Sequence, residues 1–139
     1  MAFRILIAAG NPDYLASLRE LTEAARAFLP INLEVVEART LDETRRRLAD
    51  SAPDALMADW SLVPEQTLAA VRALVAEQPE LRVLLLLPDV RREYREAAWS
   101  AGACACVPRD RIDPEWLQAM LCVMNRAKER EARLRQRVA

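Results

Sequence analysis

The residues Arg82-Val-Leu-Leu-Leu-Leu87 contain a continuous apolar run of strand length. A strand that is apolar on both faces is typical of a parallel sheet that helices cover on each side. Another apolar segment, Ala55 to Asp59, precedes this run, and the intervening residues from about Pro64 to Glu77 have helical periodicity. A strand, a helix and a second strand in this order form the unit from which parallel sheets are built. The centre of the sequence therefore predicts an α/β fold.

The same alternation of strands and helices extends toward the N-terminus. Strands are expected at Phe3–Ala8 and at about 32–38. Helices are expected to begin after Asn11 and after Thr40, because both residue types accept hydrogen bonds from the free N–H groups of a first helical turn. The apolar residues expected on the inner face of the first helix are Leu15, Leu18, Ala25 and Phe28.

Toward the C-terminus the pattern predicts one more strand between two helices. A helix from about Val90 to Ser100 is followed by Gly102, a residue suited to end a helix in the left-handed conformation. The fifth strand is expected at Ala103–Val107. A last helix should begin at Asp113-Pro114, because Asp is a good N-cap and Pro fits the first helical turn.

This last helix is expected to be unusually long, since no helix-breaking residue occurs between Pro114 and Ala139. A helix of about 25 residues measures roughly 37 Å, more than a five-stranded domain covers. We therefore expect residues 1–125 to form the domain and residues 126–139 to form a helical extension or linker that projects from it. A short heptad pattern along this helix leaves two interpretations open, a solvated extension or linker on the one hand and a dimer seam or relay helix on the other. Its apolar members are Leu117, Met120, Met124, Ala127, Leu134 and Val138, and Glu131 interrupts it at an a position.

The composition restricts the possible functions. The net charge of −1 offers no general attraction to nucleic acid, and no apolar run approaches the roughly 20 residues of a membrane-spanning helix. The chain has no His, which removes His-based triads and His metal ligands. Three cysteines, an odd number, are compatible with a reducing compartment, and the N-terminus lacks a signal-peptide pattern, so we expect a cytoplasmic protein. Cys104 and Cys106 are expected to be buried small residues and not metal ligands.

A binding site in such a sheet is expected beyond the carboxyl ends of the strands. The sequence places few reactive groups there: the carboxylate of Asp59, the guanidinium of Arg109 and the amide of Asn11. The residues at these strand ends supply neither paired acids, nor a nucleophile beside a base, nor a glycine-rich phosphate cradle. We therefore predict that the protein is not an enzyme and holds no cofactor.

Four segments resemble response-regulator receiver domains, in the order and spacing of that family. They are Ile5-Leu-Ile-Ala-Ala-Gly-Asn-Pro-Asp13, Pro53-Asp-Ala-Leu-Met-Ala-Asp59-Trp-Ser-Leu62, Arg82 to Leu87, and Ala101-Gly-Ala-Cys-Ala-Cys-Val-Pro-Arg109. The resemblance covers about residues 3–124. It implies a flavodoxin-like, doubly wound sheet of five parallel strands in the order 2-1-3-4-5, with five helices of which the last is extended.

The resemblance also implies a degenerate site, as in a pseudo-receiver. Asp59 falls on the phosphoacceptor position, but the other site positions of the family carry different residues. Ala9 and Gly10 replace the acidic pair that holds Mg²⁺, Leu87 replaces the hydroxyl residue, Cys106 the switch aromatic and Arg109 the lysine. The only lysine, Lys128, lies in the extension. Mg²⁺ binding is therefore expected to be poor, because a hard cation needs more anionic oxygen than one carboxylate supplies.

These residues lead us to expect a protein-interaction module in two-component signalling that works without phosphorylation. Asp59 and Arg109 would form a structural ion pair. Protein partners, or a second copy in a homodimer, would dock on the fourth helix, fifth strand and fifth helix, and the C-terminal helix could join such a dimer. The candidate contacts are Arg91, Arg92, Tyr94, Arg95 and Arg111.

Two alternatives remain open from the sequence. The chain could be a working, atypical receiver in a phosphorelay, with Asp59 phosphorylated by a histidine kinase. It could also be the regulatory domain of a longer protein with an output domain. Direct binding to nucleic acid is not expected, since no helix-turn-helix or RNA-binding motif occurs in these residues.

Overall fold

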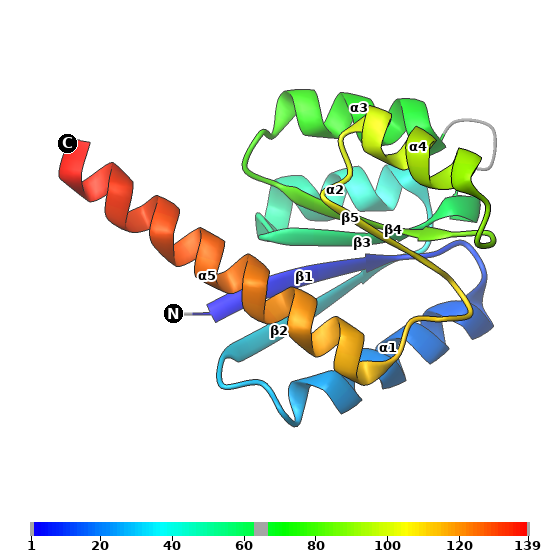
Figure 1. The fold of residues 1–139 in the computed structure, drawn as a ribbon, viewed down its shortest axis with the longest axis horizontal. Helices are drawn as coiled ribbons and strands as arrows, with labels where there is room; N and C mark the ends of the chain where they lie inside the picture. The colour runs from blue at the N-terminus through cyan, green and yellow to red at the C-terminus, as the bar shows by residue number, and fades with distance from the viewer. Residues whose placement is uncertain (1, 63–66, 139) are drawn as a thin grey trace.

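The computed structural model describes residues 2–62 and 67–138, and five parallel strands form the centre of this part of the chain (Figure 1). The strand order is β2-β1-β3-β4-β5, which confirms the predicted topology. The strands are β1 (Ala2–Ala8), β2 (Asn32–Ala38), β3 (Ala55–Asp59), β4 (Arg82–Leu87) and β5 (Ala105–Pro108). The helices are α1 (Pro12–Arg26), α2 (Leu41–Ser51), the short η1 (Trp60–Leu62), α3 (Thr67–Glu77), α4 (Arg92–Ala101) and α5 (Pro114–Val138).

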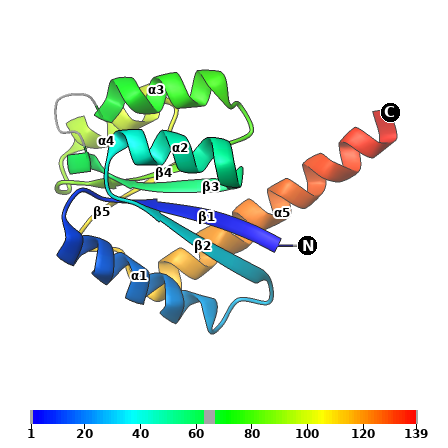
Figure 2. The ribbon, with the colours of Figure 1, turned by 180° about the vertical axis from the view of Figure 1, so that it is seen from behind.

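Helices cover the sheet on both faces, with α1 and α5 on one side and α2, α3 and α4 on the other (Figures 1 and 2). Alternate residues of a strand point to opposite faces, so the apolar run of β4 supplies two separate cores. Leu84 and Leu86 pack with α1 and α5, whereas Val83 and Leu85 pack with α2, α3 and α4. Each fully buried leucine contributes about 2 kcal/mol to folding. This burial on both faces is the physical reason for the unbroken apolar sequence.

The helix ends follow the residue types that predicted them. The side chain of Asn11 accepts a hydrogen bond from the Tyr14 N–H at 3.0 Å, and Thr40 Oγ1 accepts one from the Glu43 N–H at 3.0 Å. Gly102 ends α4 with φ +98°, and a Cβ atom there would lie 3.1 Å from Val75 Cγ1. Glycine is therefore required at this turn for both its backbone conformation and its small size.

Several details differ from the sequence-based expectation. The side chain of Phe28 is 71% exposed, because α1 ends at Arg26 and Phe28 lies in the turn beyond it. Cys104 is exposed and Cys106 half-buried, because they lie at the edge of the sheet, where a strand has a neighbour on one side only. Helix α4 begins at Arg92 and strand β5 at Ala105, two residues later than expected in each case. The expected start of the third helix at Pro64 lies outside the described residues.

Helix α5 contacts the domain along one continuous face. Leu117, Leu121 and Met124 on this face are buried against the sheet and α1, so Leu117 and Met124 are not available as a dimer seam. The same face then changes from apolar to charged where the sheet ends. Its ionic contacts are Lys128 with Asp54 at 3.0 Å, Glu131 with Arg82, and Arg135 with Glu80. The extension is thus held against the amino end of the sheet, although its last turns stand clear of the domain (Figure 1).

None of the helices in the described part of the chain combines the length and the hydropathy that crossing a bilayer requires.

Candidate functional site

The candidate site lies at the carboxyl end of β3, the central strand of the sheet. The winding direction of the chain reverses between β1 and β3, and ligands of open α/β sheets bind at such switch points. Asp59 is the last residue of β3, with Ala9 and Gly10 after β1 on one side and Leu87 at the end of β4 on the other. Arg109 follows β5, and its backbone N–H donates to the Leu87 carbonyl at 2.8 Å. The structure thus gathers five of the six site positions that the resemblance implies, and the sixth, Cys106, lies within β5.

The carboxylate of Asp59 is completely buried and only partly satisfied. The hydroxyl of Ser61, two residues further along, donates a hydrogen bond to Asp59 Oδ2. The other oxygen, Oδ1, has Arg109 Nε at 3.6 Å, which is an ion-pair contact but too long for a hydrogen bond. Oδ1 has no hydrogen-bond partner among the residues that the structure describes. Asp59 is therefore held chiefly by the positive charge of Arg109.

The side chain of Arg109 is held in turn by Tyr14 on α1. The guanidinium carbon lies 4.1 Å from the centre of the Tyr14 ring, in a cation–π contact. The Tyr14 hydroxyl donates to the backbone carbonyl of Arg109 at 3.3 Å. Burial and the negative charge of Asp59 raise the pKa of Tyr14 to about 12, while the contact with Arg109 acts in the opposite direction. The phenol therefore remains protonated at neutral pH and keeps its hydrogen bond to Arg109.

The residues around Asp59 do not fit the Mg²⁺ ion that a receiver fold implies. Ala9 is buried and Gly10 is exposed, and neither has a side-chain oxygen. No cluster of three or more His, Cys, Asp or Glu ligands occurs in the part of the chain that the structure describes. Oδ1 of Asp59, which accepts no hydrogen bond from the described residues, lies 3.6 Å from Arg109 Nε, so a protein cation already neutralises the carboxylate. Space is not the obstacle at Gly10, because a Cβ atom there would lie 3.7 Å or more from its neighbours.

The predicted interaction face has two different parts. Arg91 and Arg92 are exposed but pair within their own segment, Arg91 with Asp89 at 3.4 Å and Arg92 with Glu96 at 2.7 Å. Tyr94 is half-buried and packs edge-on against Trp60 at 5.1 Å between ring centres, so it is linked to the site and is not a free contact residue. Arg111 is exposed in the turn before α5.

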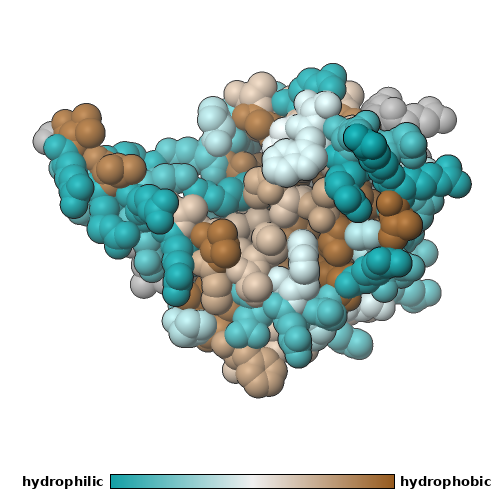
Figure 3. Space-filling view, viewed as in Figure 1, coloured by the Kyte–Doolittle hydropathy of each residue, from teal (hydrophilic) through white to brown (hydrophobic). Residues whose placement is uncertain are grey.

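Arg95 belongs to a hollow of about 360 Å³ over β5, between α4 and α5. Its walls are mostly apolar, and they include Trp99, which is 64% exposed, and the half-buried Cys106. Burial raises the pKa of the Cys106 thiol, although the nearby Arg95 acts in the opposite direction. Figure 3 shows pale and brown side chains gathered on this face, surrounded by hydrophilic ones. This half of the predicted face is therefore an exposed apolar surface.

Sequence reasoning missed three residues that shape this region. Tyr14 lies 95 positions from Arg109 in the chain, and no local pattern pairs them. Ser61 is two residues from Asp59, and its hydroxyl could have been recognised as a local hydrogen-bond donor to that carboxylate. Trp99 could have been found as the large apolar residue on the exposed side of α4.

The strand order defines a flavodoxin-like fold, and the solved structures that resemble it are mostly response-regulator receiver domains. No protein-family model and no curated protein matches the chain. At 12–24% identity, the structural likeness establishes the shared fold and not a shared activity.

Three solved structures represent these neighbours. The receiver domain of a DNA-binding response regulator from Colwellia psychrerythraea is 14% identical with a TM-score of 0.77, over 89% of this chain and 98% of that chain. A response regulator from Thermotoga maritima is 15% identical with a TM-score of 0.75, over 89% and 98%. A Burkholderia pseudomallei protein provisionally described as pilus assembly-related is 24% identical with a TM-score of 0.74, over 88% of each chain.

Proposed function

We propose that this protein is a cytoplasmic, non-catalytic signal-transduction module that binds protein partners without being phosphorylated. The observation that carries the proposal is the state of Asp59. Its carboxylate is completely buried, and the cation beside it is the guanidinium of Arg109 at 3.6 Å. Ala9 and Gly10 add no carboxylate that could hold a metal ion in its place.

Phosphoryl transfer to a carboxylate requires access to one of its oxygens and a cation that offsets the charge of the incoming group. Ser61 occupies one oxygen of Asp59, and the Tyr14–Arg109 pair lies beside the other. Leu87 is 1% exposed and has no hydroxyl that could follow a bound phosphoryl group. The half-buried Cys106 stands where the resemblance implies a mobile aromatic ring. These features support a domain with one resting conformation at this edge.

The partner surface that the structure favours is the apolar hollow between α4 and α5. Exposed apolar patches on soluble domains commonly mark interaction sites. Trp99 supplies the large aromatic side chain that often dominates binding energy, and Arg95 supplies a charged rim beside it. A histidine kinase, an output domain or a second copy could each provide the covering surface.

Phosphorylation can be tested by mass spectrometry. The purified chain is incubated with acetyl phosphate and Mg²⁺, and in parallel with a histidine kinase and ATP. We expect no increase by the mass of a phosphoryl group in either case. A phosphorylated species that is absent from the Asp59→Asn variant would contradict the proposal and would support the alternative of a working, atypical receiver.

A second candidate function is a structural role in pilus assembly. Two of the similar solved structures are provisionally described as pilus assembly-related or pilus assembly proteins, and they are 24% and 23% identical to this chain. The response-regulator structures are 12–17% identical. A strain carrying Trp99→Ser at this locus should lose surface pili in electron micrographs if this role is correct. Normal piliation would leave the general signalling role as the better proposal.

A further inference from the structure

An apolar flank runs along α5 and continues the hollow over β5. Successive residues of a helix are rotated by 100°, so positions 116, 120, 123, 127, 134 and 138 lie on one side, about a quarter turn from the face that contacts the domain. Of these, Val123 is 62%, Leu134 51% and Val138 87% exposed. Trp116 and Met120 line the hollow together with Trp99. We call this set the α5 flank: Trp116, Met120, Val123, Ala127, Leu134 and Val138.

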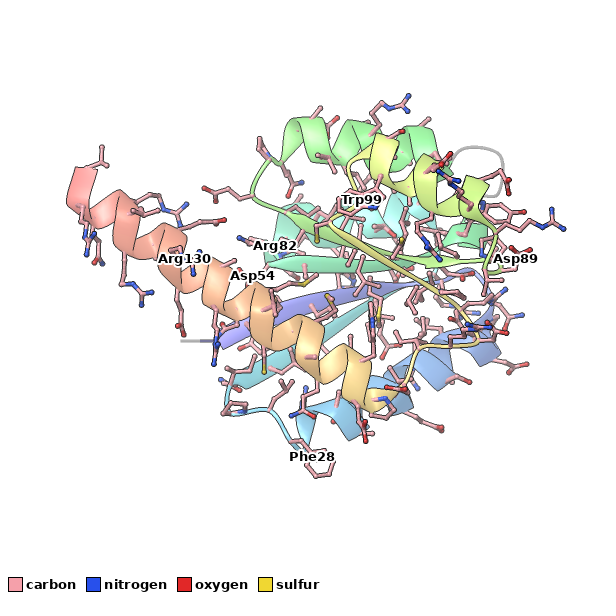
Figure 4. The ribbon with its side chains drawn as sticks, in the orientation of Figure 1. Phe28, Asp54, Arg82, Asp89, Trp99 and Arg130 are labelled. Atoms are coloured by element: carbon pink, nitrogen blue, oxygen red, sulfur yellow. The ribbon has the colours of Figure 1, made fainter. Side chains whose placement is uncertain are left out.

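A row of arginines lies next to the α5 flank, on the side of the helix that points away from the domain. It consists of Arg126, Arg130, Arg133 and Arg137, at spacings of four, three and four residues. All four side chains are exposed, and none forms an ion pair with a residue that the structure describes. The label of Arg130 in Figure 4 shows where this row lies on the extension. We call it the arginine row.

The charge of the arginine row is not balanced within the extension. Residues 126–139 carry six basic and two acidic side chains, whereas the rest of the chain carries 14 basic and 19 acidic ones. The other two basic residues of the extension, Lys128 and Arg135, bind Asp54 and Glu80 of the domain. The arginine row is therefore the part of the extension whose charge is left for another molecule.

We propose that an amphipathic helix of a protein partner, apolar on one side and acidic beside it, packs along α5. Its apolar side would cover the α5 flank, and its carboxylates would pair with the arginine row. The flank spans 22 residue steps, about 33 Å, which a partner helix of roughly 20 residues would cover. This inference rests on the proposed function and specifies the chemistry of the partner.

The apolar flank favours a protein helix over nucleic acid. Phosphate groups would pair with the arginine row but would leave Val123 and Leu134 in contact with water. A second copy of this chain fits less well, because every α-helix in its described part carries at least one arginine, and the acids that share a face of α1, Asp13, Glu20 and Glu23, have no exposed large apolar residue of that helix beside them. Two α5 helices packed antiparallel through their flanks would also place both arginine rows on the same side, where they repel.

The two parts of the surface should contribute differently to binding. Exposed ion pairs are worth less than about 1 kcal/mol each, so burial of the flank should supply most of the affinity. The arginine row should decide which partner charge is accepted, because like charges across an interface are disfavoured.

Three synthetic helical peptides provide the test, each about 20 residues long and labelled with a fluorophore. The first has leucines at heptad spacing flanked by glutamates, the second has lysine in place of glutamate, and the third has serine in place of leucine. Fluorescence anisotropy with the full chain should show binding of the first peptide alone. Binding of the first peptide should weaken about tenfold in the double variant Val123→Ser, Leu134→Ser. It should weaken by about the same factor in the double variant Arg130→Glu, Arg133→Glu.

A charge-reversal control separates a specific contact from general attraction. Arg45→Glu with Arg46→Glu makes the same change in net charge on α2, where both side chains are exposed, and should leave binding within about twofold. The Arg130→Glu, Arg133→Glu variant should prefer the lysine peptide. Circular dichroism should match the parent chain for every variant, since all of the substituted side chains are exposed.

The inference is wrong if the acidic peptide does not bind, if the α2 control weakens binding as much as the arginine-row variant, or if charge reversal fails to change the peptide preference. It is also wrong if the chain self-associates through α5 in sedimentation and the peptide does not compete, or if duplex DNA displaces the peptide. If the peptide binds and Asp59 is phosphorylated, the proposed function is wrong and this inference stands. If the peptide does not bind and Asp59 is not phosphorylated, this inference is wrong and the proposed function stands.

Discussion

The two ends of the sheet each hold an aspartate beside one cation, but the two carboxylates are satisfied to very different degrees. At the amino end, Asp54 Oδ2 accepts hydrogen bonds from the Arg4 N–H at 2.8 Å and from Lys128 Nζ at 3.0 Å. At the carboxyl end, Asp59 is fully buried, and its Oδ1 has only the ion-pair contact with Arg109 at 3.6 Å. Figure 4 shows Asp54 and Arg82 at one end of the sheet and Asp89 at the other.

This difference indicates that Asp54 contributes more to the stability of the fold than Asp59 does. Asp54, the residue before β3, joins β1, β4 and α5, since Lys128 also donates to the Ala2 carbonyl at 2.9 Å and the Asp54 carbonyl accepts from the Arg82 N–H. Asp59 joins few elements and has an oxygen without a hydrogen bond, which is costly for a buried group. The only lysine of the chain therefore pairs with the aspartate at the amino end of the sheet, and the aspartate at the carboxyl end has an arginine beside it. Substitutions at each end of the sheet test whether the two aspartates differ in this way.

The largest effect is expected from Asp54→Ala. It removes two hydrogen bonds to a charged group and leaves Lys128 unpaired, so the free energy of unfolding should fall by about 3 kcal/mol. Urea denaturation measures this change. Glu80→Ala is the matched control, because it removes the exposed pair with Arg135 and should cost less than about 1 kcal/mol. Equal losses for the two variants would contradict the role given to Asp54.

Gly10→Asp should turn the carboxyl end back toward a metal site. The added carboxylate has room and would repel Asp59, so stability in EDTA should fall by about 1–2 kcal/mol and recover when Mg²⁺ is added. Gly10→Asn, which adds no charge, should show no such dependence on Mg²⁺. Thermal unfolding at matched ionic strength provides the measurement. If the aspartate variant were indifferent to Mg²⁺, the missing acids would not explain the poor metal site.

Asp59→Asn should have a smaller effect, in the direction of higher stability. The substitution removes a buried charge, while Arg109, whose side chain is 35% exposed, can be solvated by water. The free energy of unfolding should stay the same or rise by up to about 1 kcal/mol. Asp54→Asn, measured by the same denaturation method, should instead be destabilising. If Asp59→Asn lowered the free energy of unfolding as much as Asp54→Asn, both aspartates would contribute equally to stability.

The effect that is absent at neutral pH and appears only at high pH concerns Tyr14. Its pKa is about 12 in the folded chain against the usual tyrosine value of 10.0, so the folded state holds this proton more tightly. The resulting stability is fully present below about pH 10 and is lost as the pH rises from 10 toward 12. Tyr14→Phe should therefore show a shallower decline in denaturation midpoint over this range. Identical declines in both proteins would mean that Tyr14 does not titrate with folding.

The parts of the fold that local sequence determines were predictable. The order of strands and helices follows from the spacing of apolar segments, and the helix starts after Asn11 and Thr40 follow from their capping side chains. The position of Phe28 was not predictable in the same way, because apolar periodicity continued past Arg26 although the helix ended there. The exposure of Cys104 depends on its place at the edge of the sheet, which is a tertiary property.

The sequence placed two charged residues of the candidate site at one edge of the sheet but could not supply their contacts. The sequence placed Asp59 and Arg109 at one edge, and the structure brings them to 3.6 Å. It could not place Tyr14 beside Arg109 or Lys128 beside Asp54, because these partners are 95 and 74 positions apart and only the packing of helices on the sheet joins them. The same limit applies to the inner face of α5. The sequence alone indicates a solvated surface for the charged half of this face, because the residues that pair with it lie far away in the chain.

The most direct measurement follows the fluorescence of Trp60, the residue next to Asp59. Trp99→Phe and Trp116→Phe would leave Trp60 as the single reporter, and Mg²⁺ would then be titrated together with beryllofluoride, a mimic of the phosphoryl group. With Asp59 neutralised by Arg109, we expect no saturable change at low millimolar Mg²⁺ in this protein and a clear one after Gly10→Asp. A saturable change in the protein without added acid would contradict the account.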